Sequence, residues 1–220
     1  MDAITLHHYT VPGTWQDKGS ATDFGADLYA ETMRKAAYMD DLIRGHLAIM
    51  DRYDPERRVG LIADEWGCWH NVEPGTNPGF LYQQNTMRDA MVAALTLNIF
   101  NSHAGRVVMA NLAQTVNVLQ SVVLTDGADM LLTPTYHVFD LYKAHQDAAQ
   151  ADVDVQCAQI GENGVTLPQL SASASVKDGL LTITCSNASP TDEMELDILL
   201  KDFDATGVRG RILSGSMDMY

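Results

Sequence analysis

The sequence predicts an α/β fold with parallel strands, followed by a β-rich part. Continuous apolar runs such as Val59–Ala63 suit strands that are covered on both faces. Segments whose apolar residues recur at helical spacing separate these runs as far as residue 148. After Gln150 the pattern changes, because apolar and small polar residues alternate there as in strands. We therefore predict two domains, residues 1–148 and residues 149–220.

The first domain reads as three strand–helix units. The second of its helices has the clearest limits, because Thr86 and Asp89 approximate a capping box and Gly105 is a plausible stop. Pro134 marks the entry of the third helix. We expect strands within residues 3–13, 58–67 and 106–120, and helices within residues 26–53, 85–105 and 135–148. Strands that alternate with helices in this way are typical of parallel α/β units.

The second domain reads as antiparallel. Residues 165–187 alternate around Asp178 and Gly179, and an Asp-Gly pair between two such runs predicts a hairpin. Residues 194–207 continue the same alternation. This part is expected to be sandwich-like.

The composition limits the classes of partner. With 14 basic and 29 acidic residues the net charge is -15, so the surface repels phosphate backbones and anionic lipid. A neutral ligand such as a carbohydrate is compatible with this charge. The 3 cysteines are far apart and include no C-x-x-C pair, which favours a reducing compartment. The first residues lack the pattern of a signal peptide, and we expect a cytoplasmic protein that binds neither nucleic acid nor membrane.

Polar residues follow the apolar run of each predicted strand of the first domain. They are the clusters His7-His8-Tyr9, Asp64-Glu65-Trp66 and Asn111-Leu112-Ala113-Gln114. If the strands are parallel neighbours, the three clusters meet at one rim, where α/β barrels build their active sites. A carboxylate at such a rim can act in glycoside hydrolysis, and indole rings suit the apolar faces of sugars. The alternative is that Glu65 is a solvated strand end and the tryptophans belong to the core, and the pattern alone leaves the two interpretations about equal.

Metal chemistry is the competing interpretation of the polar residues. Adjacent His7 and His8 point to opposite faces of a strand, and His137 and His145 are too far apart for an i, i+4 pair. The sequence contains no H-E-x-x-H motif, no phosphate loop and no G-x-S-x-G motif in a suitable context. We therefore predict no metal and no cofactor.

Three long segments resemble a known family. They are IADEWGCW (62–69), residues 81–127 from LYQQNTMRDAM to SVVLTDG, and LLTPTYHVFDLYKAHQDA (131–148). These segments are similar to the C-terminal half of the glycoside hydrolase family 51 α-L-arabinofuranosidases. The resemblance runs from about residue 2 to about residue 215. It implies the last part of a TIM (β/α)8 barrel followed by part of a β-sandwich, and retaining release of α-L-arabinofuranosyl groups from oligo- or polysaccharides.

The resemblance also implies roles for individual residues. Glu65 matches the nucleophile of the family, and Tyr9 matches a tyrosine that donates a hydrogen bond to it. His7 matches a pocket histidine, Gln114 a sugar-contacting glutamine, and Trp69 an indole that faces the leaving group. Family members are often oligomers, so a homo-oligomer is an expectation by analogy.

The sequence departs from the family in one essential group. The family's general acid/base is a glutamate in an N-E segment, and no N-E dipeptide occurs in these 220 residues. Retaining hydrolysis needs two carboxyl groups about 5 Å apart, and Glu31 and Glu73 are poorly placed to serve as the second. A closed barrel typically needs about 250 residues, so three units do not close one. We expect a fragment or truncated product of such an enzyme; the alternatives are a non-catalytic remnant and another retaining glycosidase, such as a xylosidase or endoglucanase.

Overall fold

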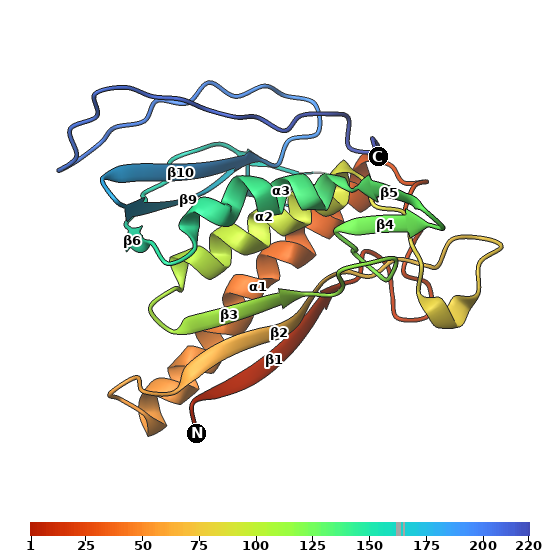
Figure 1. The fold of residues 1–220 in the computed structure, drawn as a ribbon, viewed down its shortest axis with the longest axis horizontal. Coiled ribbons are helices and arrows are strands. Elements are labelled where there is room, and N and C mark those ends of the chain that lie inside the picture. The colour runs from red at the N-terminus through yellow and green to blue at the C-terminus, as the bar shows by residue number, and fades with distance from the viewer. Residues whose placement is uncertain (162–163, 165) are drawn as a thin grey trace.

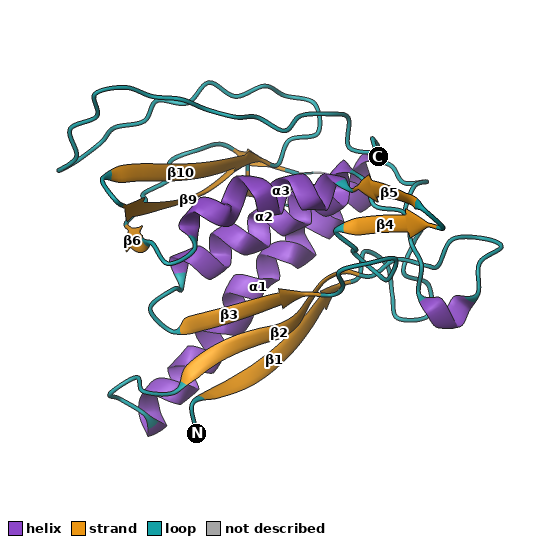
Figure 2. Ribbon diagram, viewed as in Figure 1, coloured by secondary structure: helices purple, strands orange, loops and turns teal. Residues whose placement is uncertain are grey.

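The computed structural model describes residues 1–161, 164 and 166–220. Two sheets enclose a layer of helices (Figure 1). The lower sheet in that view has the parallel order β1-β2-β3, and the upper sheet has the order β10-β9-β6. Figure 2 shows that the chain after β10 continues as long loops above the upper sheet.

The parallel sheet is formed as the apolar runs predict. Its strands are β1 (Ala3–Thr10), β2 (Gly60–Cys68) and β3 (Val107–Leu112), with β2 in the middle. Leu61 and Ala63 of β2 are almost completely buried because they face the helices. Strands β1 and β3 form the two edges of this sheet, so within the described residues the sheet is open. The expected parallel α/β units are confirmed, and their place in the last part of a TIM barrel stays a prediction.

Two long helices connect these strands. Helix α1 (Ala26–Tyr53) has the predicted limits, and α2 (Met87–Ser102) lies within its predicted range. The capping box of α2 is present, since the Thr86 side chain accepts from the helix backbone and Asp89 accepts from the Thr86 N–H. Most side chains of α2 are buried because the helix packs between the two sheets.

The third unit differs from its prediction. Strand β3 ends at Leu112, and a hairpin of β4 (Val123–Asp126) and β5 (Asp129–Leu132) follows it. Helix α3 (Pro134–Tyr142) begins at the predicted proline, with the Thr133 side chain accepting from Tyr136 N–H. It passes into the short 3-10 helix η2 (Lys143–His145). The sequence analysis predicted no hairpin here, although Gly127, the first of the two loop residues between β4 and β5, has the positive φ that glycine adopts readily.

The antiparallel sheet contains the predicted hairpin. Strand β9 (Leu170–Lys177) pairs with β10 (Leu180–Asn187), and both turn residues have positive φ, as a two-residue hairpin loop requires. Strand β6 (Ala149–Ala151) pairs with the other edge of β9. Two short strands, β7 (Gln159–Ile160) and β8 (Leu167–Pro168), form a separate pair. Residues 194–207 were expected to be β, but the structure assigns them no strand, so the sandwich also stays a prediction.

Polar contacts join the antiparallel sheet to the helices. Asn98 of α2 donates to Ser171 and accepts from Ser173 and Thr184 of the antiparallel sheet. The Tyr142 hydroxyl of α3 lies 3.0 Å from Asn98 Oδ1 and 3.1 Å from the Ala94 carbonyl oxygen, so either can accept its proton. Within the described residues, no helix is long and apolar enough to cross a membrane.

Candidate active site

The carboxyl ends of β1 and β2 lie side by side, and an irregularity sets their register. Leu6 pairs with Ala63, but the next residue, His7, pairs with Glu65. Asp64 is therefore an extra residue in β2, as in a β-bulge. The bulge brings both carboxylates of β2 next to His7, whose Nε2 lies 3.1 Å from Asp64 Oδ1 and whose Nδ1 lies 3.4 Å from Glu65 Oε2.

Tyr9 holds Glu65 from the neighbouring strand. The phenol donates a hydrogen bond of 2.8 Å to Glu65 Oε2. Burial, and then the hydrogen bond and charge of Glu65, raise the pKa of Tyr9, so the phenol keeps its proton and remains the donor. The Glu65 side chain is 48% exposed, so a ligand at the rim can reach a carboxylate whose rotamer is already fixed.

The two tryptophans of this segment have different environments. Trp66 is 1% exposed and packs against Phe100 at 5.3 Å and Phe139 at 6.1 Å between ring centroids. It is a core residue. Trp69 is half-buried and contacts the Tyr9 ring edge to face at 5.1 Å. The structure therefore brings His7, Tyr9, Glu65 and Trp69 together, as expected.

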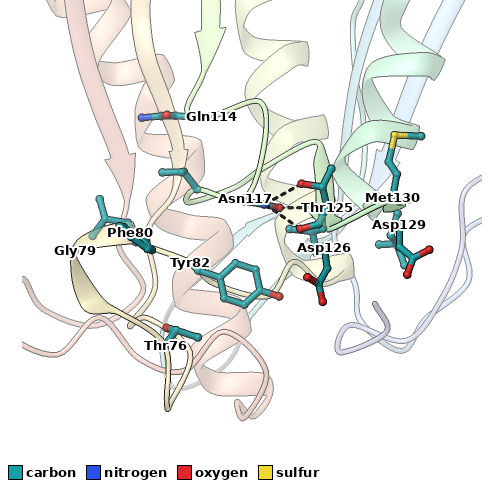
Figure 3. A pocket seen from close by; sticks show the side chains of 14 residues that line it. Thr76, Gly79, Phe80, Tyr82, Gln114, Asn117, Thr125, Asp126, Asp129 and Met130 are labelled. Atoms are coloured by element: carbon teal, nitrogen blue, oxygen red, sulfur yellow. Dashed lines mark hydrogen bonds between the residues drawn. The ribbon is translucent and has the colours of Figure 1, made fainter.

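Gln114 lies apart from this group of contacts. It follows β3, is exposed, and its backbone N–H donates to the Val118 carbonyl. It lines a cavity of about 1030 Å³ between residues 76–82 and the β4–β5 hairpin. Figure 3 shows Gln114 at the edge of this cavity, away from Tyr82 and Asp126. Its contact with a sugar stays a prediction.

The histidines of β1 confirm the alternation of the strand. His8 points away from His7 toward α1, where its Nε2 lies 3.4 Å from the Lys35 carbonyl and its ring contacts Tyr38. Burial lowers the pKa of His8, which favours a neutral ring against the helix.

A buried polar cluster of Cys68, His70, Arg88 and Asp89 lies between the end of β2 and the start of α2. Potential ligand atoms of Cys68, His70 and Asp89 lie within 4.8 Å of one another. Arg88 Nη2 is 3.2 Å from both ring nitrogens of His70, and His70 Nε2 is 2.9 Å from Asp89 Oδ1. A guanidinium so close to the ring opposes a metal cation. The cluster instead ties the start of α2 to the strand end, because buried Gln120 also accepts from Cys68 N–H and donates to the Asp89 carbonyl.

The two other glutamates considered as acids are engaged elsewhere. Arg34 binds both oxygens of Glu31 at 2.8 and 2.6 Å, and this contact lowers the Glu31 pKa. Glu73 accepts from the Gln84 N–H at 2.9 Å. Asp64 is the immediate neighbour of Glu65 on the same strand. Two carboxyl groups on one side of a bond do not flank it, so none of the three fits as the partner of Glu65.

Sequence reasoning missed three features of the site. The Asp64 bulge, Trp15 and Lys18 all depend on segments that are distant in sequence. Trp15 packs on Trp69 at 5.7 Å, and Lys18 lies above both indoles. The signal available in the sequence was a tryptophan within the turn-rich segment of residues 11–20.

Comparison with known proteins identifies the family of the chain. The family model described as the alpha-L-arabinofuranosidase C-terminal domain matches residues 64–220. An intracellular exo-alpha-L-arabinofuranosidase of Bacteroides ovatus is 47% identical over 98% of the chain and 42% of its own length. The crystal structure of the GH51 arabinofuranosidase from Xanthomonas axonopodis pv. citri superposes with a TM-score of 0.86 at 48% identity, over 87% of the chain and 39% of that protein.

A more distant relative covers a similar region. An intracellular exo-alpha-(1->5)-L-arabinofuranosidase of Streptomyces lividans is 25% identical over 94% of the chain and 32% of its own length. The chain thus spans less than half the length of the relatives it matches. The match to the family model begins at Asp64, beside the candidate nucleophile Glu65, and continues to the last residue. The chain belongs to the α-L-arabinofuranosidase C-terminal domain family and corresponds to the C-terminal region of the GH51 arabinofuranosidases.

Proposed function

We propose that this chain carries the nucleophile side of a retaining glycoside hydrolase that releases α-L-arabinofuranosyl groups from arabinose-containing saccharides. The observation that carries the proposal is the 2.8 Å hydrogen bond from Tyr9 to the half-exposed Glu65 at the rim of a parallel sheet. The names of the relatives supply the sugar. Residues 1–148 are then the last units of a TIM barrel, and residues 149–220 are part of a β-sandwich.

In this mechanism a Glu65 oxygen attacks the anomeric carbon. The bond to the leaving oxygen breaks as an acid protonates that oxygen, and a covalent glycosyl-enzyme forms. Water, which gives its proton to the conjugate base of that acid, then displaces the Glu65 carboxylate from the same carbon and restores the original configuration. Tyr9 contributes by holding the carboxylate in one rotamer throughout.

The acid must come from outside the set of carboxylates discussed above. We infer that it belongs to the part of the complete protein that corresponds to the remaining length of the relatives. The names of two relatives include the word intracellular, which supports a cytoplasmic location. A polar rim without a metal or cofactor suffices for this chemistry, since both roles are taken by carboxyl groups.

A chimera tests the proposal. This chain would replace the matched C-terminal segment of the Bacteroides ovatus relative, and turnover of p-nitrophenyl α-L-arabinofuranoside would be measured. Glu65→Ala should reduce turnover by several powers of ten, and azide should restore part of it by attacking from the vacated side. Glu56→Ala is the matched control, because Glu56 lies in the α1–β2 connection at the opposite end of the strands. Near-normal hydrolysis by Glu65→Ala would reject the nucleophile assignment.

The chain by itself, outside the chimera, provides a second test. It should not hydrolyse the same substrate, because a nucleophile without a proton donor and a complete pocket does not expel the leaving group efficiently. Robust turnover that depends on Glu65 would show that an acid is present within these residues. A folded but inactive chimera would favour the non-catalytic remnant.

A further inference from the structure

Trp15 is an exposed indole that the proposed nucleophile chemistry does not use. It lies in the loop between β1 and α1, and 61% of its surface is accessible. A large aromatic side chain left in water forgoes the free energy that its burial would contribute. Its position therefore needs an explanation beyond packing.

The loop that carries Trp15 is firmly held. Lys35 of α1 donates from Nζ to the carbonyls of Val11, Pro12 and Gly13 at 2.9, 2.9 and 2.8 Å. Gly13 is confined as well, since a Cβ there would lie 2.3 Å from the Asp17 carbonyl oxygen. The exposed ring thus sits on a preorganised support, which lowers the entropic cost of binding a ligand.

A second set of bonds fastens the same loop to the end of β2. The Asn71 side chain accepts from Lys18 N–H at 3.0 Å and donates to Asp17 Oδ1 at 2.7 Å. Asn71 N–H donates to the Gly19 carbonyl. The position of Trp15 is therefore coupled to the strand end that carries Glu65.

Three rings connect the nucleophile to Trp15. The Tyr9 ring contacts Trp69 at 5.1 Å, and Trp69 contacts Trp15 at 5.7 Å, both edge to face. We call Tyr9, Trp69 and Trp15 the aromatic shelf. Lys18 Nζ lies 5.6 Å from the Trp15 ring and 5.2 Å from the Trp69 ring, and it donates to the Trp15 carbonyl at 2.9 Å. The ammonium group therefore holds both indoles and adds a hydrogen-bond donor beside them.

We propose that Trp15, fixed by Lys18, is a binding platform for the sugar on the leaving-group side of the scissile bond. The proposal rests on the proposed function, because it takes Glu65 as the fixed end of the shelf. A sugar ring offers apolar C–H faces to an indole and hydroxyl groups to an ammonium donor. Trp15 thus selects substrates whose leaving group is itself a saccharide.

Proton NMR of the complete chain tests binding directly. The three indole N–H signals are assigned with Trp→Phe variants, and α-1,5-linked arabinotriose is the probe. We expect the Trp15 and Trp69 signals to shift on titration while that of buried Trp66 stays in place. Trp15→Ala should weaken binding at least tenfold, Trp15→Tyr should keep most of it, and Tyr53→Ala at the far end of α1 is the control. An unmoved Trp15 signal would overturn the proposal, because the whole shelf lies in this chain.

Kinetics of the chimera separate this proposal from the proposed function. The measured quantity is kcat/KM for arabinotriose divided by kcat/KM for α-L-arabinofuranosyl fluoride, whose leaving group is too small to reach a platform. Trp15→Ala should lower this ratio at least tenfold, mainly through KM. An unchanged ratio with active enzyme would overturn the platform alone. If neither substrate shows turnover that depends on Glu65, the result would instead count against the proposed function.

Discussion

Replacement of Trp66 by alanine should destabilise the protein by about 3–5 kcal/mol, the usual cost of deleting a large buried aromatic side chain. The structure places this residue among the most strongly buried, at 1% exposure in the main hydrophobic cluster. Its ring meets Phe100 edge to face and lies nearly parallel to Phe139. Both contacts and the buried volume disappear together in the variant.

A phenylalanine at the same position separates volume from polarity. The indole nitrogen of Trp66 is buried, and within the described residues it has no hydrogen-bond partner. Leaving such a donor unsatisfied costs about 1–3 kcal/mol, so its removal offsets part of the lost packing. We therefore expect Trp66→Phe to cost less than about 2 kcal/mol, clearly less than Trp66→Ala.

Urea denaturation followed by far-ultraviolet circular dichroism measures both changes. Trp15→Ala is the matched control, because an exposed substitution usually changes stability by no more than about 0.5 kcal/mol. The free energy of unfolding of a domain is about 5–15 kcal/mol. Trp66→Ala therefore keeps a measurable unfolding transition when the unmodified protein has a free energy of unfolding above the lower limit of this range. The reasoning fails if Trp66→Ala and Trp15→Ala have equal midpoints, since Trp66 would then not be a core anchor.

Three further predictions concern polar groups. Tyr9→Phe in the chimera should slow turnover about tenfold without lowering the thermal midpoint. A hydrogen bond to a charged group contributes roughly 1.5–3 kcal/mol, and at this half-exposed site we expect a value near the lower limit. An unaltered rate and pH–rate profile would show that Tyr9 and Glu65 are not coupled. Burial lowers the pKa of His8, His70 and His145, so below about pH 6.5 the unfolded state binds more protons, and the thermal midpoint should fall as pH drops from about 7 to 5; a flat midpoint contradicts this. Arg106→Ala should destabilise the protein clearly more than Arg58→Ala in urea denaturation, because buried Arg106 donates to Asp51, Asp54 and the Val59 carbonyl, whereas Arg58 is exposed and its loss should cost less than about 1 kcal/mol; equal costs would refute the role of Arg106.

The parts of the fold that the sequence predicted are those with local causes. Helix α2 begins as expected because Thr86 and Asp89 satisfy its first N–H groups within a few residues. The β9–β10 hairpin forms because Asp178 and Gly179 adopt the positive φ that its turn needs. Residues 194–207 have strand-like alternation but no strand assignment. A strand also needs a partner that alternation does not specify, and a short isolated pair is only marginally stable.

The same distinction between local causes and distant partners holds for the residues of the site. The position of Glu65 at the end of an apolar run predicts the rim, and the family resemblance predicts the Tyr9 contact that the structure shows. Trp15 could not be placed from the sequence, because its partner Trp69 is on another element. Arg88 reads as an ordinary residue of the first helical turn, yet it is completely buried against His70.

The order of acids and indole at the end of β2 follows from the bulge. Leu61 and Ala63 face the helices, so strict alternation would turn Glu65 toward the core and Trp66 toward the open face. The pairing instead gains one residue at Asp64, and the alternation reverses beyond it. Glu65 therefore meets Tyr9 at the rim, while Trp66 enters the core against Phe100. One extra residue thus places a charged side chain and a large apolar one, adjacent in sequence, in the two environments that each requires.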